Sequence, residues 1–388
     1  MKCGVVRETY PGECRVALVP AVLPTLTKAG ITLVLEAGAG EAAGYPDKLY
    51  QDQGAAIVTR REEVFSGADV LVQVRALGAN CEAGITDLGL VRAGQTIIAF
   101  CEPLGAPEAL QQFSARGVSV LAMEMIPRIT RAQSMDALSS MATVAGYKAA
   151  LLAAAALPKM FPMMMTAAGT LLPARALILG VGVAGLQAIA ATRRLGAVVE
   201  AYDVRPDVKD QAQSLGAKFL ELPLETAGAQ DAGGYAKAFD ESFYRRQREL
   251  LTTALARQDV VITTAAVPGR KAPLLITADM VEVMQPGSVI VDLAAERGGN
   301  CELTRLGETV VHRGVTILGP DNLPSTVPMH ASQMYAKNVA SLLAHLVKAG
   351  KLELDTDDEI TRETLVARGG EIVHPKVREA LERNAVSR

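Results

Sequence analysis

The sequence has no tryptophan, and aromatic residues make up only 4% of its 388 positions. Histidine is also scarce: the four histidines are His312, His330, His345 and His374, so the first 311 residues contain none. Histidine is the side chain that most often acts as general acid or base near neutral pH. Chemistry in the N-terminal three quarters of the chain therefore has to use other groups or to need no proton transfer.

The five cysteines stand at positions 3, 14, 81, 101 and 301, and no two of them have CxxC spacing. An odd number of scattered cysteines argues against a disulfide framework and predicts a reducing, cytoplasmic location. No group of histidine, cysteine and carboxylate residues has zinc-site spacing, so we expect no metal site. A net charge of −3 with mixed signs argues against a nucleic-acid-binding surface.

Long uncharged runs are missing too, although 49% of the residues are hydrophobic. Two of the longest cover residues 176–192 and 160–174, and they are only 17 and 15 residues long. A membrane-spanning helix needs roughly 18–20 apolar residues, and both runs are interrupted by glycine or proline. The N-terminus lacks the apolar core of a signal peptide. We therefore expect no transmembrane segment and interpret the apolar residues as buried parallel strands covered by helices.

Apolar, strand-like runs alternate with helical patterns over the first 125 residues, which indicates a parallel α/β sheet. The predicted strands cover residues 3–6, 32–36, 70–74, 96–101 and 118–123, and the clearest helices cover residues 22–29 and 107–115. A long helix rich in Ala, Leu and Met is predicted over residues 134–156 and bridges to a second domain.

The alternation restarts at residue 176 with six more strands, as expected for a doubly wound sheet. They are predicted over residues 176–179, 198–203, 218–222, 259–263, 288–293 and 315–318. After Pro328 an amphipathic helix, with Gly350 placed to end it, returns the chain to the first domain. Two further strands are expected in the tail, over residues 364–367 and 371–374.

The predicted fold class is therefore α/β, with two Rossmann-like doubly wound parallel-sheet domains, joined by long helices and separated by a cleft. We expect residues 1–142 and 326–388 to form a discontinuous N-terminal domain and residues 143–325 to form the second domain.

Three segments of the second domain depart from this alternation. The methionine run at residues 163–165 is more typical of flexible core packing than of a binding surface. Residues 223–234 are small and polar, which predicts a mobile loop. A charged helix is expected over residues 235–257.

Gly180, Gly182 and Gly185 form a GxGxxG motif that follows a predicted strand and opens a predicted helix. Asp203 ends the next strand, 18 residues after Gly185. These are the conditions under which the motif predicts dinucleotide binding: a tight turn, a close approach of the backbone to the pyrophosphate, and close helix–strand packing at the third glycine. The alternative interpretation is a glycine-rich turn that binds no nucleotide.

Asp203 is expected to accept hydrogen bonds from the adenosine ribose and to repel a 2′-phosphate, which favours NAD(H), while Arg205 softens that preference. The loop over residues 263–269 and Asn322 follow other strands of the same sheet and are expected to line the ligand crevice, although ordinary loop chemistry is the alternative. The expected contact residues in this domain also include Val183, Val204, Thr264 and Ala265.

The segment Arg128-Ile-Thr-Arg-Ala-Gln133-Ser-Met-Asp136 resembles the signature loop of the NAD(H)-binding subunit of proton-translocating nicotinamide nucleotide transhydrogenase. The resemblance extends over nearly the whole chain, from residue 5 to about residue 375. It continues through residues 161–169, 180–187, 233–237, 291–301, 336–338 and 371–375.

Alanine dehydrogenases are similar to this subunit, and the resemblance to them implies a substrate-binding lysine and histidine near the ends of two N-terminal strands. The corresponding stretches here end in Arg75 and Glu102, with neither lysine nor histidine. Arginine cannot readily donate a proton. Arg15 is shared by both groups and does not discriminate between them.

The resemblance implies that Arg128 and Asp136 hold the nicotinamide carboxamide and ribose, that Gln133 bridges toward a second nucleotide, and that Ser139 adds a contact. Gly234 and Tyr235 then lie on a loop that closes over NAD(H). The alternatives are a surface ion pair between Arg128 and Asp136, a solvated Gln133 and an ordinary exposed tyrosine.

Hydride transfer between two nicotinamides releases no proton at the reacting carbon, so such a site needs positioning and water exclusion rather than an acid or base. The scarcity of histidine suits this reaction, with hydride passing from NADH to NADP⁺ on a partner. An NAD-dependent amino acid dehydrogenase and a non-catalytic NAD-binding regulatory module remain the alternatives.

The resemblance also implies partners. No hydrophobic anchor precedes Arg388. We therefore expect separate membrane-spanning and NADP(H)-binding subunits, a homodimer of this chain, and a peripheral location on the cytoplasmic face of the inner membrane.

Overall fold

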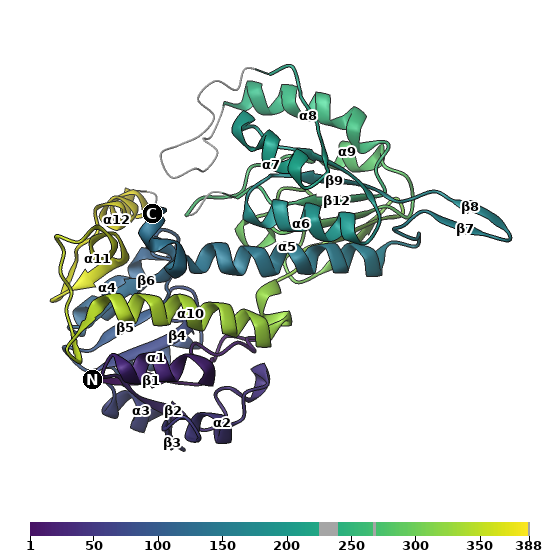
Figure 1. The fold of residues 1–388 in the computed structure, drawn as a ribbon. Coiled ribbons are helices and arrows are strands. Elements are labelled where there is room, and N and C mark those ends of the chain that lie inside the picture. Colours follow the sequence, from purple (N-terminus) through teal and green to yellow (C-terminus); the bar gives the residue numbers. More distant parts are fainter. Residues whose placement is uncertain (225–239, 267–268, 387–388) are drawn as a thin grey trace. The chain divides into compact units, whose positions relative to one another are not determined.

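The computed structural model describes residues 1–224, 240–266 and 269–386 and divides into two compact units (Figure 1). Unit 1 comprises Met1–Met141 and Pro324–Arg388, and unit 2 comprises Ala142–Leu323.

Unit 1 is built on an eight-stranded sheet with the order β19-β18-β6-β5-β4-β1-β2-β3. The first six strands in the chain are parallel, and β18 and β19 add an antiparallel edge. Read from β3, the order 3-2-1-4-5-6 is that of a doubly wound sheet. The bounds are β1 Lys2–Val5, β2 Thr32–Glu36, β3 Ala56–Val58, β4 Val70–Arg75, β5 Thr96–Phe100, β6 Ser119–Ala122, β18 Leu365–Arg368 and β19 Glu371–Ile372.

Helices cover this sheet, and the strands read as continuous apolar runs because both faces are buried. Phe65, Leu110 and Phe113 pack from the helices into a core with Leu71 and Ile97 of the strands. The helices are α1 Leu23–Lys28, α2 Asp47–Gln51, α3 Arg61–Gly67, α4 Pro107–Ala115, α10 Pro328–Leu346, α11 Glu359–Thr364 and α12 Pro375–Val386, with 3-10 turns η1 Pro20–Val22, η2 Glu41–Ala43, η3 Gly84–Gly89, η4 Met123–Met125 and η5 Thr130–Met135.

In unit 2 the six parallel strands have the same order within a seven-stranded sheet, β11-β10-β9-β12-β13-β15-β14, in which β14 forms an antiparallel edge. Two Rossmann-like parallel sheets confirm the predicted fold class. The bounds are β9 Arg175–Leu179, β10 Val198–Tyr202, β11 Lys218–Phe219, β12 Val260–Thr263, β13 Val289–Asp292, β14 Thr309–His312 and β15 Val315–Leu318.

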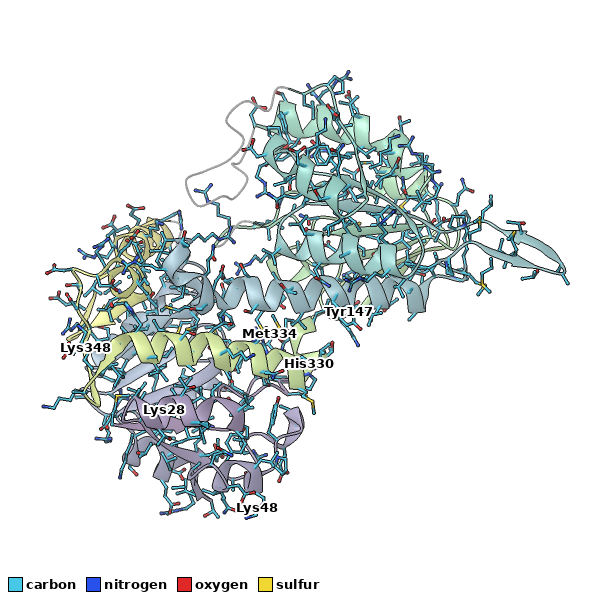
Figure 2. All side chains as sticks on the ribbon, in the orientation of Figure 1. Lys28, Lys48, Tyr147, His330, Met334 and Lys348 are labelled. Atoms are coloured by element: carbon cyan, nitrogen blue, oxygen red, sulfur yellow. The ribbon has the colours of Figure 1, made fainter. Side chains whose placement is uncertain are left out.

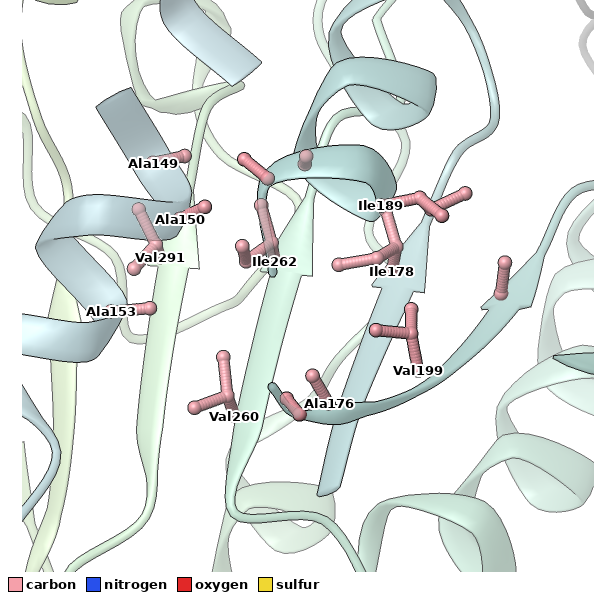
Figure 3. Packing of buried hydrophobic residues seen from close by; sticks show 14 of the residues in the cluster. Ala149, Ala150, Ala153, Ala176, Ile178, Ile189, Val199, Val260, Ile262 and Val291 are labelled. Atoms are coloured by element: carbon pink, nitrogen blue, oxygen red, sulfur yellow. The ribbon is translucent and has the colours of Figure 1, made fainter. Parts of the chain in front are cut away.

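Alternate residues of the unit 2 strands enter two separate cores on the two faces of the sheet, as the strand period of two requires. On one face Ile178 and Ile262 pack with alanines of α5 and with Ile189 of α6 (Figure 3). On the other, Leu177 and Val261 pack with α8 and α9. The helices are α5 Ala137–Ala156, α6 Val183–Arg194, α7 Lys209–Ser214, α8 Glu241–Leu255 and α9 Ala278–Glu282, with 3-10 turns η6 Pro206–Val208 and η7 Ala295–Arg297.

The methionine run is not core packing, so that prediction was wrong. It forms β7 (Met164–Thr166), which pairs with β8 (Gly169–Leu171) in a hairpin that extends away from the rest of unit 2 (Figure 1). Every residue of both strands is exposed, and Met165 retains 83% of its surface. Methionine fills cores or covers adaptable binding surfaces, and composition alone does not separate these two uses.

Gly350 does not end the helix after Pro328, which is a second correction. α10 stops at Leu346, and the chain turns at Ala349 and Gly350, both with positive φ, between β16 (Val347–Lys348) and β17 (Lys351–Leu352). Positive φ at two successive turn residues is the geometry of a tight β-hairpin, and glycine suits it as well as it suits a helix end.

Among the described residues, one helix, α5, has the length and hydropathy of a membrane span. Its Ala149, Ala150 and Ala153 belong to the core of unit 2 (Figure 3). Gly146 lies so close to α6 that a Cβ on it would stand 2.1 Å from the Ala184 carbonyl oxygen. Tight packing of this kind is what gives a core helix the same composition as a membrane helix.

Candidate functional site

The turn after β9 has the geometry that a glycine-rich nucleotide loop needs. Gly180 has φ of +96°, a conformation that L side chains rarely adopt. A Cβ on Gly185 would stand 1.9 Å from the Gly180 carbonyl oxygen, so only glycine lets α6 start this close to β9. Thr264, which follows the neighbouring strand β12, donates from its Oγ1 to the same carbonyl at 3.0 Å and so fixes the turn.

Gly182 differs from both neighbours, because a Cβ there would meet nothing within 4 Å. It is the N-cap of α6, a helix of 12 residues, and its carbonyl accepts from Leu186 N–H at 2.8 Å. A glycine that no packing requires, at the N-terminus of a helix whose dipole favours anions, fits the close approach of a pyrophosphate. Val183 follows it and is exposed.

Asp203 closes the loop from β10 and is saturated with donors. Its Oδ2 accepts from Val181 N–H at 2.7 Å and from Arg205 Nη2 at 2.8 Å, and its Oδ1 accepts from Arg205 N–H and Nε, both at 2.9 Å. The ion pair is largely buried, with 12% of Arg205 and 5% of Asp203 exposed. Val204 between them packs on the core. The two residues that the sequence assigns to coenzyme choice therefore contact each other.

The loop after β12 continues the same edge of the sheet. Thr264 N–H donates to Leu179 O at 2.8 Å, and a Cβ on Gly180 would reach Ala265 N at 3.1 Å, so Thr264 and Ala265 lie against the glycine turn. Asn322, buried and with φ of +46°, has its N–H held by Glu296 Oε1 at 3.0 Å. In an open α/β sheet this carboxyl edge is where ligands bind.

The signature loop 128–136 lies in unit 1, where Asp136 is fixed by hydrogen bonds and two other predicted contact residues are exposed. Asp136 caps α5, because its carboxylate accepts from Ser139 N–H at 2.9 Å and from Ser139 Oγ at 2.5 Å. Arg128 and Gln133 are exposed. Asn338 Nδ2 donates to Ser134 O at 2.9 Å and ties the loop to α10. The loop is thus held at its backbone and at Asp136.

At the carboxyl edge of the unit 1 sheet, charged side chains of the same unit contact one another. Arg15 donates to both carboxylate oxygens of Glu13, at 2.7 and 2.6 Å, and the two side chains are 3% and 0% exposed. Arg75 lies 3.6 Å from Glu13 and stacks on Tyr10. Glu8 accepts from the N–H groups of Val74 and Arg75. Burial, and then the Glu13 carboxylate, raise the pKa of Glu8 to about 8.

Glu124 is a second buried carboxyl at this edge. Its Oε1 accepts from the N–H groups of Cys101 and Glu102, at 2.7 and 2.8 Å, whereas its Oε2 is buried without a hydrogen-bond partner. Burial, and then the Glu102 carboxylate, raise the pKa of Glu124 to about 8. Glu102 has φ of +47°. Arg75 ends β4, and Glu102 follows β5.

Some expected residues lie outside the described part of the chain: Gly234 and Tyr235, the loop 225–239 around them, and residues 267–268 of the loop after β12. Across the described ranges, no three His, Cys, Asp or Glu side chains are arranged to hold a metal ion. His330 is exposed on the first turn of α10 (Figure 2).

Sequence reasoning missed Asn300, which is fully buried and holds the loop after β12. The sequence did contain one indication of this residue, the pair Gly298 and Gly299 just before it, both of which have positive φ. The segment 291–301 was noted only because it resembles the transhydrogenase subunit.

Comparison with known families and structures agrees with this geometry. The family model described as alanine dehydrogenase/PNT, N-terminal domain, matches residues 4–145, and the one described as alanine dehydrogenase/PNT, C-terminal domain, matches residues 149–375.

Individual relatives cover almost the whole chain. An NAD(P) transhydrogenase subunit alpha polypeptide of Rhodospirillum rubrum is 44% identical over 97% of this chain and 98% of its own length. The crystal structure of a transhydrogenase from Sinorhizobium meliloti is 41% identical, with a TM-score of 0.86 over 96% of this chain and 100% of that one. An L-alanine dehydrogenase structure is 26% identical, with a TM-score of 0.82 over 99% of both chains. The chain therefore belongs to the alanine dehydrogenase/PNT family.

Proposed function

We propose that this chain is the NAD(H)-binding subunit of an NAD(P) transhydrogenase and takes part in hydride transfer from NADH to NADP⁺ held on a partner subunit. The observation that carries the proposal is the glycine turn of unit 2. Gly182 is required by no packing, whereas Gly180 and Gly185 are required by the turn itself. Likeness to transhydrogenase alpha subunits at 44% identity supports the same function.

The residues present fit a dinucleotide. The N-terminus of α6 faces open space at Gly182 and supplies backbone donors for a pyrophosphate. Asp203 supplies acceptors for ribose hydroxyl groups once they displace Arg205, and its negative charge disfavours a 2′-phosphate. Bound NADH supplies the hydride, and the protein supplies position and shelter from water.

Amino acid oxidation fits this chain less well, because it needs a cation for the substrate carboxylate and a base for the released proton. The two candidate cations, Arg15 and Arg75, both contact Glu13. No histidine precedes His312. Hydride transfer between nicotinamides needs neither group, since no proton is released at the reacting carbon.

Within the signature loop we assign Arg128 and Asp136 to the nicotinamide carboxamide and ribose, Gln133 to the contact with the second nucleotide, and Ser139 to support of Asp136. The hydrogen bonds between Asp136 and Ser139 are those of a helix cap, which fixes their position at the start of α5. Gln133 is exposed, as a residue that meets a second nucleotide has to be. Gly234 and Tyr235 complete the proposed contacts.

We further propose that each unit is one domain, that the chain is a homodimer, and that it binds membrane-spanning and NADP(H)-binding subunits at the cytoplasmic face of the inner membrane. The β7–β8 hairpin supports the dimer. Met163, Met165 and Leu172 are 60%, 83% and 72% exposed, and residues 160–174 carry no charge. Large uncharged apolar surface is typical of interfaces between identical chains.

The function is tested by adding the NADP(H)-binding partner subunit to the chain and following reduction of an NADP⁺ analogue by NADH. We expect transfer only when both subunits are present. Tight NADH binding without transfer would favour a regulatory module, and reduction of NAD⁺ by L-alanine with the chain alone would favour a dehydrogenase.

The variant Gln133→Asn sharpens this test. It shortens the side chain proposed to meet the second nucleotide, so we expect slower hydride transfer with nearly unchanged NADH affinity. An equal loss of transfer and of NADH affinity would instead make Gln133 a plain NADH-binding residue.

A further inference from the structure

Asn300 makes three hydrogen bonds from a fully buried side chain in the loop after β13. Its Oδ1 accepts from Ala265 N–H at 3.0 Å, and its Nδ2 donates to Ala265 O and to Pro273 O, both at 2.8 Å. The side chain thus binds both polar groups of residue Ala265, much as a neighbouring strand would. This contact replaces the sheet pairing that ends for β12 at Thr263.

Asp292 in turn fixes the backbone that carries Asn300. Its buried carboxylate accepts from the N–H groups of Ala294, Asn300 and Cys301 at 2.8–3.0 Å, and from Thr263 Oγ1 and Thr304 Oγ1 at 2.8 and 2.7 Å. Five donors around one buried charge hold the loop in one conformation. Asn300 is therefore placed by a rigid anchor rather than by a mobile surface loop.

Ala265 lies next to the proposed pyrophosphate turn. A Cβ on Gly180 would stand 3.1 Å from Ala265 N, and Thr264 Oγ1 donates to the Gly180 carbonyl. In this strand order the adenosine half of a dinucleotide lies over β10, where Asp203 stands, and the other half lies over β12. The chain segment that Asn300 holds is thus on the nicotinamide side of the turn.

We propose that Asn300 is a positioning residue for the nicotinamide half of the coenzyme, because it fixes the Ala265 backbone against which that half is bound. The proposal rests on the proposed function, since it assumes that unit 2 binds NAD(H). It assigns Asn300 no contact with the coenzyme itself. Its effect has to appear with ligands that carry a nicotinamide and to be absent with ligands that lack one.

The test compares binding of NADH and of ADP-ribose, which lacks the nicotinamide, by the full-length chain at a temperature below unfolding. We expect Asn300→Ala to weaken NADH binding about tenfold, as the loss of buried hydrogen bonds predicts. Binding of ADP-ribose should change less than about twofold. Asn300→Asp keeps the volume and the acceptor but turns an oxygen toward two carbonyl groups. It should therefore lower the ratio of NADH to ADP-ribose affinity, as the alanine variant does. If the alanine variant does not fold, the aspartate variant decides the test.

Asn80 provides the matched control. It is 2% exposed in unit 1, and its Nδ2 donates to Thr9 Oγ1 at 2.9 Å. Asn80→Ala should lower the melting temperature without changing the ratio of NADH to ADP-ribose affinity. Equal effects of the Asn300 variants on both ligands, or no effect on either, would overturn the positioning role alone. A wild-type chain that bound neither ligand would overturn the proposed function, and this inference with it.

Discussion

The two units use the same strand order but treat the carboxyl edge of the sheet differently. In unit 2 that edge is glycine-lined, and open space lies in front of Gly182. In unit 1 it is occupied by buried charged side chains that bind one another, above all Glu13 and Arg15. The unit 2 edge leaves open space for a ligand at Gly182, whereas the unit 1 edge buries its charges against one another.

This difference explains how one architecture can serve two roles within a chain. A doubly wound sheet brings the ends of its parallel strands together whatever residues stand there. The identity of a few residues then decides whether the edge binds a ligand or holds the fold together, so the proposed coenzyme binding rests on residues such as Gly182 and Asp203 rather than on the sheet.

The largest expected effect is in unit 1. Glu13→Gln leaves the buried Arg15 guanidinium without its charged partner, so we expect the free energy of unfolding to fall by about 3 kcal/mol. NADH affinity should stay unchanged, because the Glu13–Arg15 pair is buried and has no proposed contact with the coenzyme. Chemical denaturation and NADH titration measure the two quantities. Glu63→Gln, which breaks an exposed pair with Arg60, is the control and should leave the free energy of unfolding nearly unchanged, because exposed ion pairs contribute little.

Gly182→Ala should have the opposite profile. A methyl group there meets no protein atom, so the melting temperature should stay the same, but it stands where the backbone approaches the pyrophosphate. We expect NADH affinity to fall at least about 100-fold, which corresponds to roughly 2.7 kcal/mol. Gly89→Ala, at another glycine with nothing within 4 Å, is the matched control in unit 1. Unchanged NADH binding by the Gly182 variant would break the contrast between the units.

Asp203→Asn should weaken NADH binding about tenfold and bring NADPH binding closer to it, because the variant removes the charge that repels a 2′-phosphate. The same change removes the carboxylate that neutralises Arg205 and leaves this cation near the position of that phosphate. Fluorescence titration with both coenzymes checks the prediction, with Asp207→Asn as an exposed control. Unchanged affinity for both coenzymes would refute the role of Asp203.

The smallest effect, counted per pH unit, concerns the pH dependence of stability. Burial holds the pKa of Glu124 at about 8 in the folded chain, above the ordinary 4.5, so the folded state binds more protons than the unfolded state between these values. Stability therefore falls as pH rises from about 5 to 8. One such group contributes up to about 1.4 kcal/mol per pH unit.

Glu124→Gln mimics the protonated form and should reduce that slope by about 1 kcal/mol per pH unit. Unfolding by urea at pH 6, 7 and 8 measures it. Glu8→Gln tests the second buried carboxyl of the same edge in the same way. A slope that stays the same in Glu124→Gln would show that this carboxyl is already ionised in the folded chain.

Periodicity and glycine positions were enough to predict the fold and the glycine turn after β9. β2 and β15 begin and end where the sequence pattern places them, because a buried parallel strand is a continuous apolar run bounded by turn residues. β14 was missed, since its alternate residues face solvent at the edge of the sheet. The exposed methionine hairpin was missed because composition does not record exposure.

Other features depend on contacts between distant residues. Asp203 and Arg205 are two residues apart, and Arg205 was expected to soften the coenzyme preference, but the ion pair between them was not predicted. Asn300 acts on Ala265, 35 residues away, and Arg15 contacts Met141 Sδ across 126 residues. Contacts of this kind appear only when the topology is known, which is why the sequence indicated a candidate site but not the residues that support it.

Isotope transfer tests the central claim most directly. The chain, combined with its NADP(H)-binding partner subunit, is given NADH carrying deuterium at the transferred position of C4, together with NADP⁺ in ordinary water. The account predicts that the deuterium appears in the NADPH, because hydride passes between the nicotinamides without exchange. NADPH without deuterium, or deuterium released to water, would contradict it.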